Sequence, residues 1–199
     1  MEQIILASGS PKRAEYFKLL GLPFTCMPAE LDETFDDSSD PRLVAEELAV
    51  RKVNAIVNRL RSETPAEAVT WVCGADTLIT LDGLIYGKPL DREDAARMLR
   101  TFAGKEHQVW SAVALYNGRE ETIDYRSMLS IVSFAELSED EINWYLDTDE
   151  WQDAAGAYKI QGLASCLIKS IKGSYSSVAG LPLRLFYVML KDNGYPLLK

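Results

Sequence analysis

The sequence predicts an α/β fold built on a mixed sheet, and two observations point to it. Strand-like and helix-like patterns alternate through the first half of the chain, with strands near 3–7, 24–28 and 69–80 and helices over 11–20 and 41–60. In addition, Asp82-Gly83 and Asn117-Gly118 each lie between apolar runs, as two-residue hairpin turns do. The alternation favours parallel strands, whereas hairpins require antiparallel ones. The sheet is therefore expected to contain both kinds.

Three further helices are predicted from their ends. Asp91 can cap a helix that runs to Phe102, with a buried stripe at Ala95, Met98, Leu99 and Phe102. Ser138 and Glu141 have the spacing of a capping box. A last helix is expected within "GLPLRLFYVMLKDNG", closed by Gly194. Residues 29–40 are acidic and aperiodic, which indicates a surface loop with mostly solvated charges.

Length and composition limit the class of protein. With 199 residues, 47% of them hydrophobic, the chain is expected to form a single domain over 1–199, or two lobes sharing a core. No apolar run approaches the roughly 20 residues of a membrane span, and no signal-peptide pattern is present, so a cytoplasmic protein is expected. A net charge of -9 argues against binding a nucleic acid polymer. An anionic ligand would need a local cluster of cations.

Cysteine and histidine usage excludes several kinds of site. Cys26, Cys73 and Cys166 are odd in number and widely separated, so neither a disulfide framework nor a zinc site is indicated. We expect them to be buried as small apolar residues. The single histidine, His107, excludes a centre with several histidine ligands. It lies in an apparent strand, where a structural role is expected.

The first predicted helix carries charge of the wrong sign for its position. Ser10 is the expected N-cap and Pro11 the first helical residue, and Lys12 and Arg13 follow. The free N–H groups make a helix start partly positive, so stability alone would favour Asp or Glu there. Two cations on such a start suit a multiply charged anion such as phosphate. Two solvated cations are the alternative.

Two more charged residues interrupt apolar patterns. Lys52 falls between Leu48 and Ile56 on the apolar face of its helix, so it points inward, either snorkelling to the rim or reaching a phosphate. Asp76 interrupts a run that otherwise reads as a buried strand, and Gly74 beside it indicates a bulge or a close backbone approach. A buried carboxylate must be paired, hydrogen-bonded or metal-bound. We therefore expect Asp76 to be functional.

Two later positions have both a functional and an ordinary interpretation. Lys88 lies in a turn fixed by Gly87 and Pro89, where most lysines are only solvated. Gln161 stands in a glycine-punctuated apolar segment and is expected to be a buried amide that needs both donors and acceptors. A uracil or thymine edge would satisfy it, and so would an ordinary peptide group.

Seven segments in order along the chain resemble the Maf family of nucleoside triphosphate pyrophosphatases. They are "ASGSPKR", "DE" at Asp32-Glu33, "RK" at Arg51-Lys52, "GADT", "GKP", "AGAYKIQG" and "SYSSVAGLPL". The resemblance implies a mixed, twisted sheet in two lobes around a central cleft, related to the inosine triphosphate pyrophosphatases. It also implies a cytoplasmic homodimer that acts with a divalent cation, Mg²⁺, Mn²⁺ or Co²⁺.

The resemblance also implies roles for individual residues. Those expected to hold the triphosphate are Ser8, Arg13, Lys52 and Lys88. Glu33 and Asp76 would bind the metal or activate water, with Asp76 at the position of the proton acceptor. The catalytic set is thus Asp76, Glu33, Lys52 and Lys88.

Base selection is implied at three further positions. Lys12, Thr77 and Gln161 match those associated with choice of base in the dTTP/UTP branch. The branch that prefers 7-methyl-GTP tends to have "SDQ" in place of "ADT" and Glu in place of Gln161. A neutral pyrimidine imide suits an amide, whereas a cationic methylated purine suits a carboxylate. Lys12 departs from the pattern, because the dTTP/UTP branch commonly has Arg at this position. The compact ammonium of lysine does not reproduce the two parallel hydrogen bonds that a planar guanidinium can donate.

The expected activity is therefore hydrolysis of dTTP and UTP to the monophosphate and pyrophosphate. The cations and the metal would neutralise the phosphates, while Asp76 takes a proton from water or holds the metal that lowers the water's pKa. Two alternatives remain open at this stage. One is a nucleotide-binding regulator of cell division without turnover, and the other is a house-cleaning enzyme for modified nucleotides such as 7-methyl-GTP.

Overall fold

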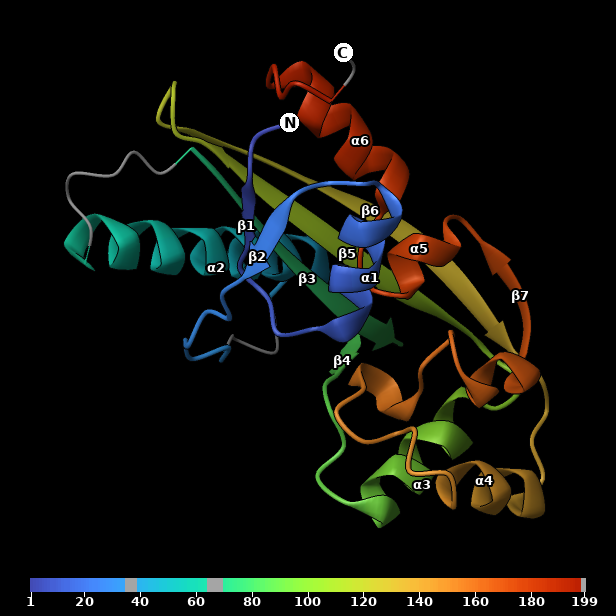
Figure 1. Cartoon of the computed structure of the whole chain (residues 1–199). Helices are drawn as coiled ribbons and strands as arrows, with labels where there is room; N and C mark the ends of the chain where they lie inside the picture. Colours follow the sequence, from blue (N-terminus) through green and yellow to red (C-terminus); the bar gives the residue numbers. More distant parts are fainter. Residues whose placement is uncertain (35–38, 64–69, 198–199) are drawn as a thin grey trace. The chain divides into compact units, whose positions relative to one another are not determined.

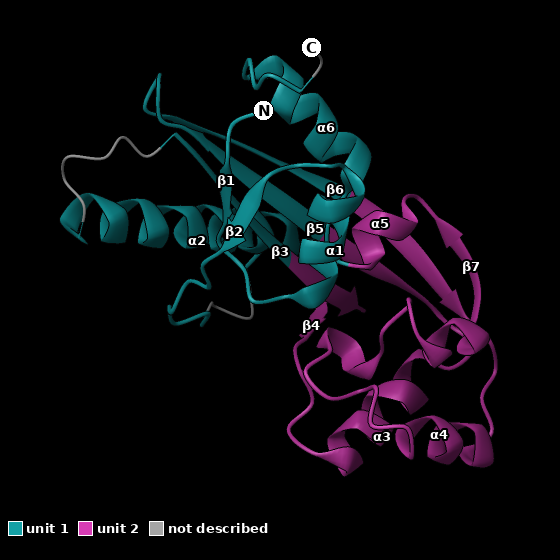
Figure 2. Ribbon diagram, viewed as in Figure 1, with its two compact units in different colours: residues 1–76, 111–128, 180–199 teal, residues 77–110, 129–179 magenta. Residues whose placement is uncertain are grey.

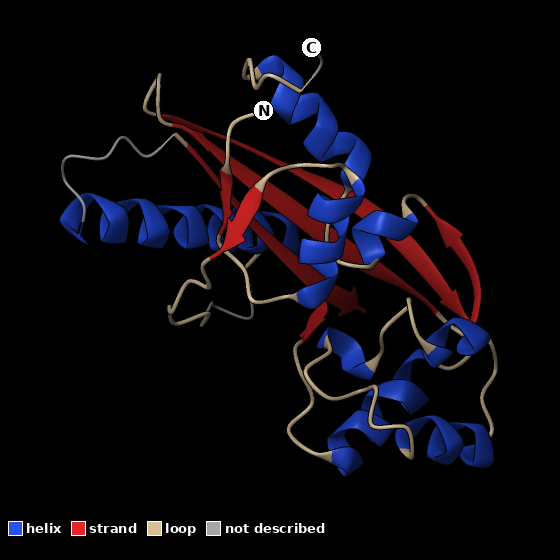
Figure 3. Ribbon diagram, viewed as in Figure 1, coloured by secondary structure: helices blue, strands red, loops and turns tan. Residues whose placement is uncertain are grey.

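The computed structural model describes residues 1–34, 39–63 and 70–197, and in them a seven-stranded sheet of order β2-β1-β3-β5-β6-β7, with β4 paired to β3 (Figure 3). The strands are β1 (Ile4–Leu6), β2 (Phe24–Cys26), β3 (Trp71–Leu81), β4 (Leu84–Tyr86), β5 (Glu106–Asn117), β6 (Thr122–Phe134) and β7 (Ile168–Lys172). β1 pairs in parallel with β2 and β3, whereas β3 with β4 and β6 with β7 are antiparallel. The predicted mixed α/β class is confirmed.

The five helices that the sequence predicts are present in the described residues, and a further short helix, over residues 175–178, was not predicted (Figure 1). They are α1 (Pro11–Leu19), α2 (Pro41–Glu63), α3 (Arg92–Phe102), α4 (Glu139–Leu146), α5 (Tyr175–Val178) and α6 (Leu183–Asp192), with short 3₁₀ turns η1 (Ala155–Ala157) and η2 (Leu163–Leu167). The capping box of Ser138 and Glu141 and the Asp91 cap are both present. None of the helices in the described ranges is long and apolar enough to cross a membrane. Residues 35–38 of the expected surface loop, and residue 69 of the expected strand, lie outside the described residues.

One of the two predicted hairpin turns is confirmed and the other is wrong. Asp82 and Gly83 have φ of 53° and 80° between antiparallel β3 and β4, as a two-residue turn requires. Asn117, in contrast, is the last residue of β5, and the turn spans residues 118–121. The Asn117 side chain accepts a hydrogen bond from the Arg119 N–H at 3.0 Å, and Glu121 takes the positive φ. An Asn-Gly pair begins this turn without forming its centre.

The chain divides into two compact units, coloured separately in Figure 2. Unit 1 comprises residues 1–76, 111–128 and 180–199, and unit 2 comprises residues 77–110 and 129–179. In unit 1, α1 packs against α6, since the rings of Phe17 and Phe186 are 5.1 Å apart, and against β2 through Phe24 at 5.3 Å. Trp71 of β3 meets Tyr195 edge-on at 5.3 Å. The carboxyl end of β1 lies beside Cys73, near the beginning of β3, because Leu6 pairs with Cys73 in the parallel ladder.

The core of unit 2 is aromatic. Phe102 at the end of α3 contacts Tyr86 at 4.9 Å and His107 at 4.5 Å between ring centroids. His107 Nε2 is 2.8 Å from the Tyr158 hydroxyl, and burial lowers the pKa of His107 to about 4. The predicted structural role of His107 is confirmed. Its Nδ1 is buried without a hydrogen-bond partner among the described residues, so the ring is neutral and packs as part of the core.

The three cysteines are free, but only Cys73 is buried as expected. Burial raises the pKa of Cys73 to about 12, which makes it inert. The prediction is wrong for Cys26 and Cys166, which are exposed. Cys26 ends β2, the strand at the edge of the sheet, and Cys166 lies in the η2 turn. Neither position has the apolar neighbours that a central strand supplies.

Candidate active site

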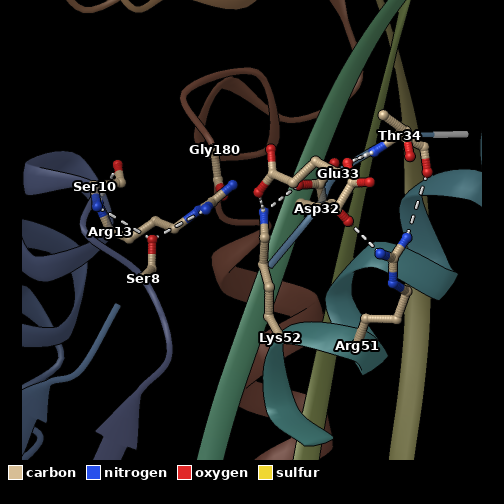
Figure 4. A network of polar contacts seen from close by, with 10 residues as sticks. Ser8, Ser10, Arg13, Asp32, Glu33, Thr34, Arg51, Lys52 and Gly180 are labelled. Carbon is tan, nitrogen blue, oxygen red and sulfur yellow. Dashed lines mark hydrogen bonds and ion pairs between the residues drawn. The ribbon is translucent and has the colours of Figure 1, made fainter. Parts of the chain in front are cut away.

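The start of α1 holds a half-buried arginine in a fixed position (Figure 4). Ser10 caps the helix by accepting a bond from the Arg13 N–H, and no acidic residue occupies the first turn. The Arg13 side chain donates from Nε to the Gly180 carbonyl at 2.9 Å and from Nη1 to Ser8 Oγ at 3.1 Å. Ser8 Oγ also accepts from the Ser10 N–H at 3.2 Å. Hydrogen bonds through Ser8 Oγ therefore connect the turn of residues 8–10 to the Arg13 guanidinium.

Lys12, the neighbouring cation, is held differently. Its Nζ pairs with Glu15 at 2.7 Å and lies 5.1 Å from the centre of the Tyr16 ring, within cation–π range. About a quarter of the side chain is exposed, 24%. Both side chains are half-buried, but Arg13 is bonded to Ser8 and Gly180, whereas Lys12 pairs with Glu15 within its own helix.

Helix α2 approaches β3 closely because residue 74 is a glycine. A Cβ added to Gly74 would lie 2.6 Å from the Ala49 carbonyl oxygen, 2.9 Å from Val53 Cγ2 and 3.3 Å from Lys52 Cβ. Real Cβ atoms do not come so near a backbone oxygen, so no other residue fits without moving the helix. The predicted close approach at Gly74 is confirmed. It brings Lys52 on α2 within reach of Asp76 on β3.

Lys52 joins two carboxylates through one ammonium group. Its Nζ lies 2.6 Å from Asp76 Oδ1 and 2.7 Å from Glu33 Oε1. The Lys52 and Asp76 side chains are 10% and 9% exposed, whereas Glu33 is 54% exposed. The inward direction predicted for Lys52 and the buried position predicted for Asp76 are both confirmed. Glu33 comes from the irregular segment after β2 and reaches the pair from the solvent side.

Arg51, next to Lys52 on α2, contacts the backbone of the segment that carries Glu33 (Figure 4). Its guanidinium donates to the Asp32 carbonyl and, at 3.5 Å, to the Thr34 carbonyl. The "RK" motif predicts no role for this arginine. Its partners are main-chain atoms, whose positions no residue pattern reveals.

The electrostatics of this part of unit 1 favour a charged ligand. Burial lowers the pKa of Arg13, and the nearby Asp76, Cys73 and Glu33 oppose that shift, so the guanidinium lies in the field of both carboxylates. A guanidinium stays charged at neutral pH regardless. Arg13 and Lys52 can therefore bind phosphate oxygens, while Asp76 can accept a proton or, with Glu33, ligate a hard cation. In the described part of the chain, no group of three or more His, Cys, Asp and Glu side chains could hold a metal.

The other predicted site residues belong to unit 2 and are described within it. Lys88 is 65% exposed and pairs loosely with Asp153, the nearest N–O distance being 3.6 Å. Thr77 follows Asp76 directly on β3 and is half-buried.

Gln161 was expected to be buried, and that prediction is wrong: its side chain is exposed. It lies in a turn closed by a bond from the Gly162 N–H to the Lys159 carbonyl at 3.0 Å. A turn of this kind projects the side chain outward, whatever the hydrophobicity of its neighbours. The amide is thus accessible to a ligand.

The fold is of the mixed α/β class and is similar to that of a solved structure, the Staphylococcus aureus Ham1 protein. The two share 15% identity with a TM-score of 0.53, over 96% of this chain and 99% of the other, which establishes similarity of fold alone. The chain belongs to the Maf family, since the family model described as Maf-like protein matches residues 3–193. The resemblance stated from the sequence motifs is confirmed.

Proteins named dTTP/UTP pyrophosphatase are similar to this chain over nearly its whole length. The one from Symbiobacterium thermophilum is 43% identical over 99% of this chain and 97% of its own. The one from Pelotomaculum thermopropionicum is 40% identical over the whole of both chains. Another, from Bacillus cytotoxicus, is 40% identical over 98% of each.

Proposed function

We propose that this protein is a nucleoside triphosphate pyrophosphatase that hydrolyses dTTP and UTP to the nucleoside monophosphate and pyrophosphate. The observation that carries the proposal is the buried Lys52–Asp76 pair, with Glu33 on the same ammonium. Taking an ion pair out of water contributes little to stability, so the presence of this pair near Arg13 indicates a chemical role. Relatives named dTTP/UTP pyrophosphatase support the choice of substrate.

Arg13 and the start of α1 are proposed to bind the triphosphate. The guanidinium is already fixed by Ser8 and Gly180, so binding costs little side-chain entropy. Free N–H groups at the helix start add to the attraction for phosphate. Lys52, Lys88 and Lys12 are proposed to supply further positive charge to the phosphates and to the leaving pyrophosphate.

Asp76 is proposed to accept the proton of the attacking water. The water oxygen forms a bond to phosphorus of the α–β linkage, the bridging P–O bond breaks, and the electron pair leaves on the departing phosphate group. Lys52, 2.6 Å from Asp76, fixes the orientation of this carboxylate. The exposed flank beside Glu33 is the route by which water and substrate reach the pair.

A divalent cation fits this arrangement. Glu33 and Asp76 present carboxylate oxygens to a common point, now marked by the Lys52 ammonium. Mg²⁺ is usually bound by one or two carboxylates together with substrate phosphates, and Mn²⁺ accepts the same donors. When bound, such an ion would neutralise phosphate charge and polarise the attacked bond. Glu33 and Asp76 are therefore the proposed metal ligands.

Thr77 and Gln161 are proposed to select the base, together with Lys12. An amide can donate to a pyrimidine carbonyl and accept from the ring N3–H, which matches uracil and thymine. Gln161 is exposed in its turn, so these groups are available to a ligand. We also propose that residues 1–199 act as one domain and that the protein is a cytoplasmic homodimer, as the family resemblance implies. Light scattering of the purified protein tests the dimer.

The proposed activity is tested with a panel of triphosphates. Purified protein is incubated with UTP, dTTP, CTP, GTP and 7-methyl-GTP in the presence of Mg²⁺, Mn²⁺ or Co²⁺, and the pyrophosphate released is measured. We expect the highest kcat/KM for dTTP and UTP. Preference for 7-methyl-GTP would support the house-cleaning alternative for modified nucleotides. Binding of nucleotides without any turnover would support the regulator and contradict the proposal.

A further inference from the structure

The segment that carries Glu33 depends on side chains for its conformation. Residues 27–34 form no helix or strand. The Asp32 carboxylate accepts a hydrogen bond from the Thr34 N–H at 2.9 Å, which closes a small turn around Glu33. This bond is the main cause that lowers the pKa of Asp32, and Arg51 contributes through its charge. Glu33 is thus the central residue of a turn with a polar side chain on each side.

Arg51 binds this turn by its backbone. The guanidinium donates to the carbonyls of Asp32 and Thr34, the residues immediately before and after Glu33. Figure 4 shows Arg51 and Lys52 extending from α2 toward the same turn, one to its backbone and the other to the Glu33 carboxylate. Two consecutive residues of one helix therefore hold the main chain and the side chain of a single glutamate.

An arginine on a helix surface usually serves a local ion pair. Arg42 and Arg59 do so, pairing with Glu46 and Glu63 one turn later at 3.0 Å and 2.9 Å. Arg51 has Glu47 one turn earlier, yet its guanidinium is directed to two main-chain carbonyls of a segment 17 to 19 residues away. A planar guanidinium reaches the two carbonyls with two separate nitrogens, Nη1 and Nη2, whereas a lysine would have to reach both with a single nitrogen.

We propose that Arg51 is a positioning residue, which fixes the turn of residues 32–34 so that the Glu33 carboxylate stays beside Lys52 and Asp76. The proposal rests on the proposed function in assigning Glu33 to the reaction. The Lys52–Glu33 ion pair cannot hold the turn alone, because Glu33 is more than half exposed and exposed pairs are weak. Arg51 acts through the backbone and does not contact the substrate.

The test is a double-mutant cycle between Arg51 and Glu33, with pyrophosphate release from dTTP as the kinetic readout. Arg51→Met keeps the length of the side chain and removes the donors, and Arg59→Met on the same helix is the matched control. We expect Arg51→Met to lower kcat by about ten- to hundredfold, the usual effect of a small misplacement, while KM changes little. In the Glu33→Gln background, Arg51→Met should lower kcat by less than about threefold, because the two residues act as one unit.

If Arg51→Met folds poorly, a second variant, Arg51→Lys, is used, and both its kcat and the hydrogen exchange of its backbone amides are measured. The lysine keeps the charge but has one nitrogen in place of the rigid fork that reaches both carbonyls, so we expect an intermediate loss of kcat. Exchange of the Thr34 amide should become roughly tenfold faster in Arg51→Lys, while the amides in the middle of α2 keep their rates.

Three results would overturn the proposal. Arg51→Met could lower kcat equally with Glu33 intact and in the Glu33→Gln background, or lower it no more than Arg59→Met does. The Thr34 amide could also exchange at an unchanged rate in Arg51→Lys. Absence of pyrophosphate release by the unmodified protein would instead contradict the proposed function. The exchange comparison would then decide by itself whether Arg51 holds the turn.

Discussion

Lys52 Nζ lies 2.6 Å from Asp76 Oδ1, and each of the two side chains is about nine-tenths buried. Helix α2 supplies the lysine and strand β3 the aspartate, so the distance between them depends on how closely the helix packs on the strand. An ion pair in such surroundings is stabilising only while its geometry is good. Any change that moves α2 away from β3 should therefore affect both stability and catalysis.

Gly74→Ala tests this dependence. The added methyl group would lie 2.6 Å from the Ala49 carbonyl oxygen, and the backbone of α2 would have to move. We expect a loss of about 1–3 kcal/mol in the free energy of unfolding, typical of overpacking, and a fall in kcat from the displaced Lys52. Chemical denaturation and steady-state kinetics measure the two effects.

Gly87→Ala is the matched control for stability. A Cβ at Gly87 would meet no atom within 4 Å, and its φ is not in the left-handed region. We expect the free energy of unfolding to change by less than about 0.5 kcal/mol. A Gly74→Ala protein as stable and active as the unmodified one would show that the close approach is not required.

Arg13→Ala tests the site at the start of α1. The substitution removes a half-buried guanidinium that donates to Ser8 and Gly180, and with it a charge proposed to face the triphosphate. We expect KM for dTTP to rise at least about tenfold, since hydrogen bonds to charged groups are among the stronger ones. Lys18→Ala, an exposed cation at the other end of the same helix, should leave KM unchanged. Equal KM values for the two variants would remove Arg13 from substrate binding.

Gln161→Glu tests base recognition. The carboxylate has acceptors only and carries charge, so it cannot donate to a pyrimidine carbonyl. We expect kcat/KM for UTP and dTTP to fall by about ten- to hundredfold, and that for 7-methyl-GTP to fall less or to rise. The measurement uses one metal and one pH for both proteins. A uniform fall for every nucleotide would mean that Gln161 does not read the base.

The buried His107 predicts how stability depends on pH. Its pKa is lowered from 6.5 to about 4, so below pH 6.5 the unfolded chain binds a proton that the folded chain does not. The free energy of unfolding should therefore decrease as the pH falls from about 6.5 to about 4, by about 3 kcal/mol. His107→Gln keeps a side chain able to hydrogen-bond to Tyr158 and should flatten this part of the curve. Parallel curves for the two proteins would contradict the account.

The elements of the fold were predictable where the evidence is local. Ser10, Asp91 and Ser138 each cap the helix that the sequence predicts, because a cap is a bond between residues two or three apart. The inward Lys52 and the buried Asp76 were also predictable, because each breaks an apolar period.

Other features depend on the tertiary structure. The Gly180 carbonyl that receives Arg13 lies 167 residues along the chain, and the carbonyls that receive Arg51 belong to an irregular segment. The exposure of Gln161 is set by a turn, and that of Cys26 by its place on an edge strand. Apolar neighbours in the sequence did not indicate the exposure of Gln161, and the number and spacing of the cysteines did not indicate that of Cys26.

The reactive role of Asp76 is the central claim, and Asp76→Asn tests it most directly. Asn is nearly the same size and cannot accept a proton at neutral pH, while Asp140→Asn, in the exposed first turn of α4, is the control. Each protein is incubated with dTTP and metal, and dTMP and pyrophosphate are quantified together. We predict equal amounts of the two products from the unmodified protein and from Asp140→Asn, and a rate at least about a hundredfold lower from Asp76→Asn in a protein that stays folded. Near-normal pyrophosphate release by folded Asp76→Asn would contradict the account.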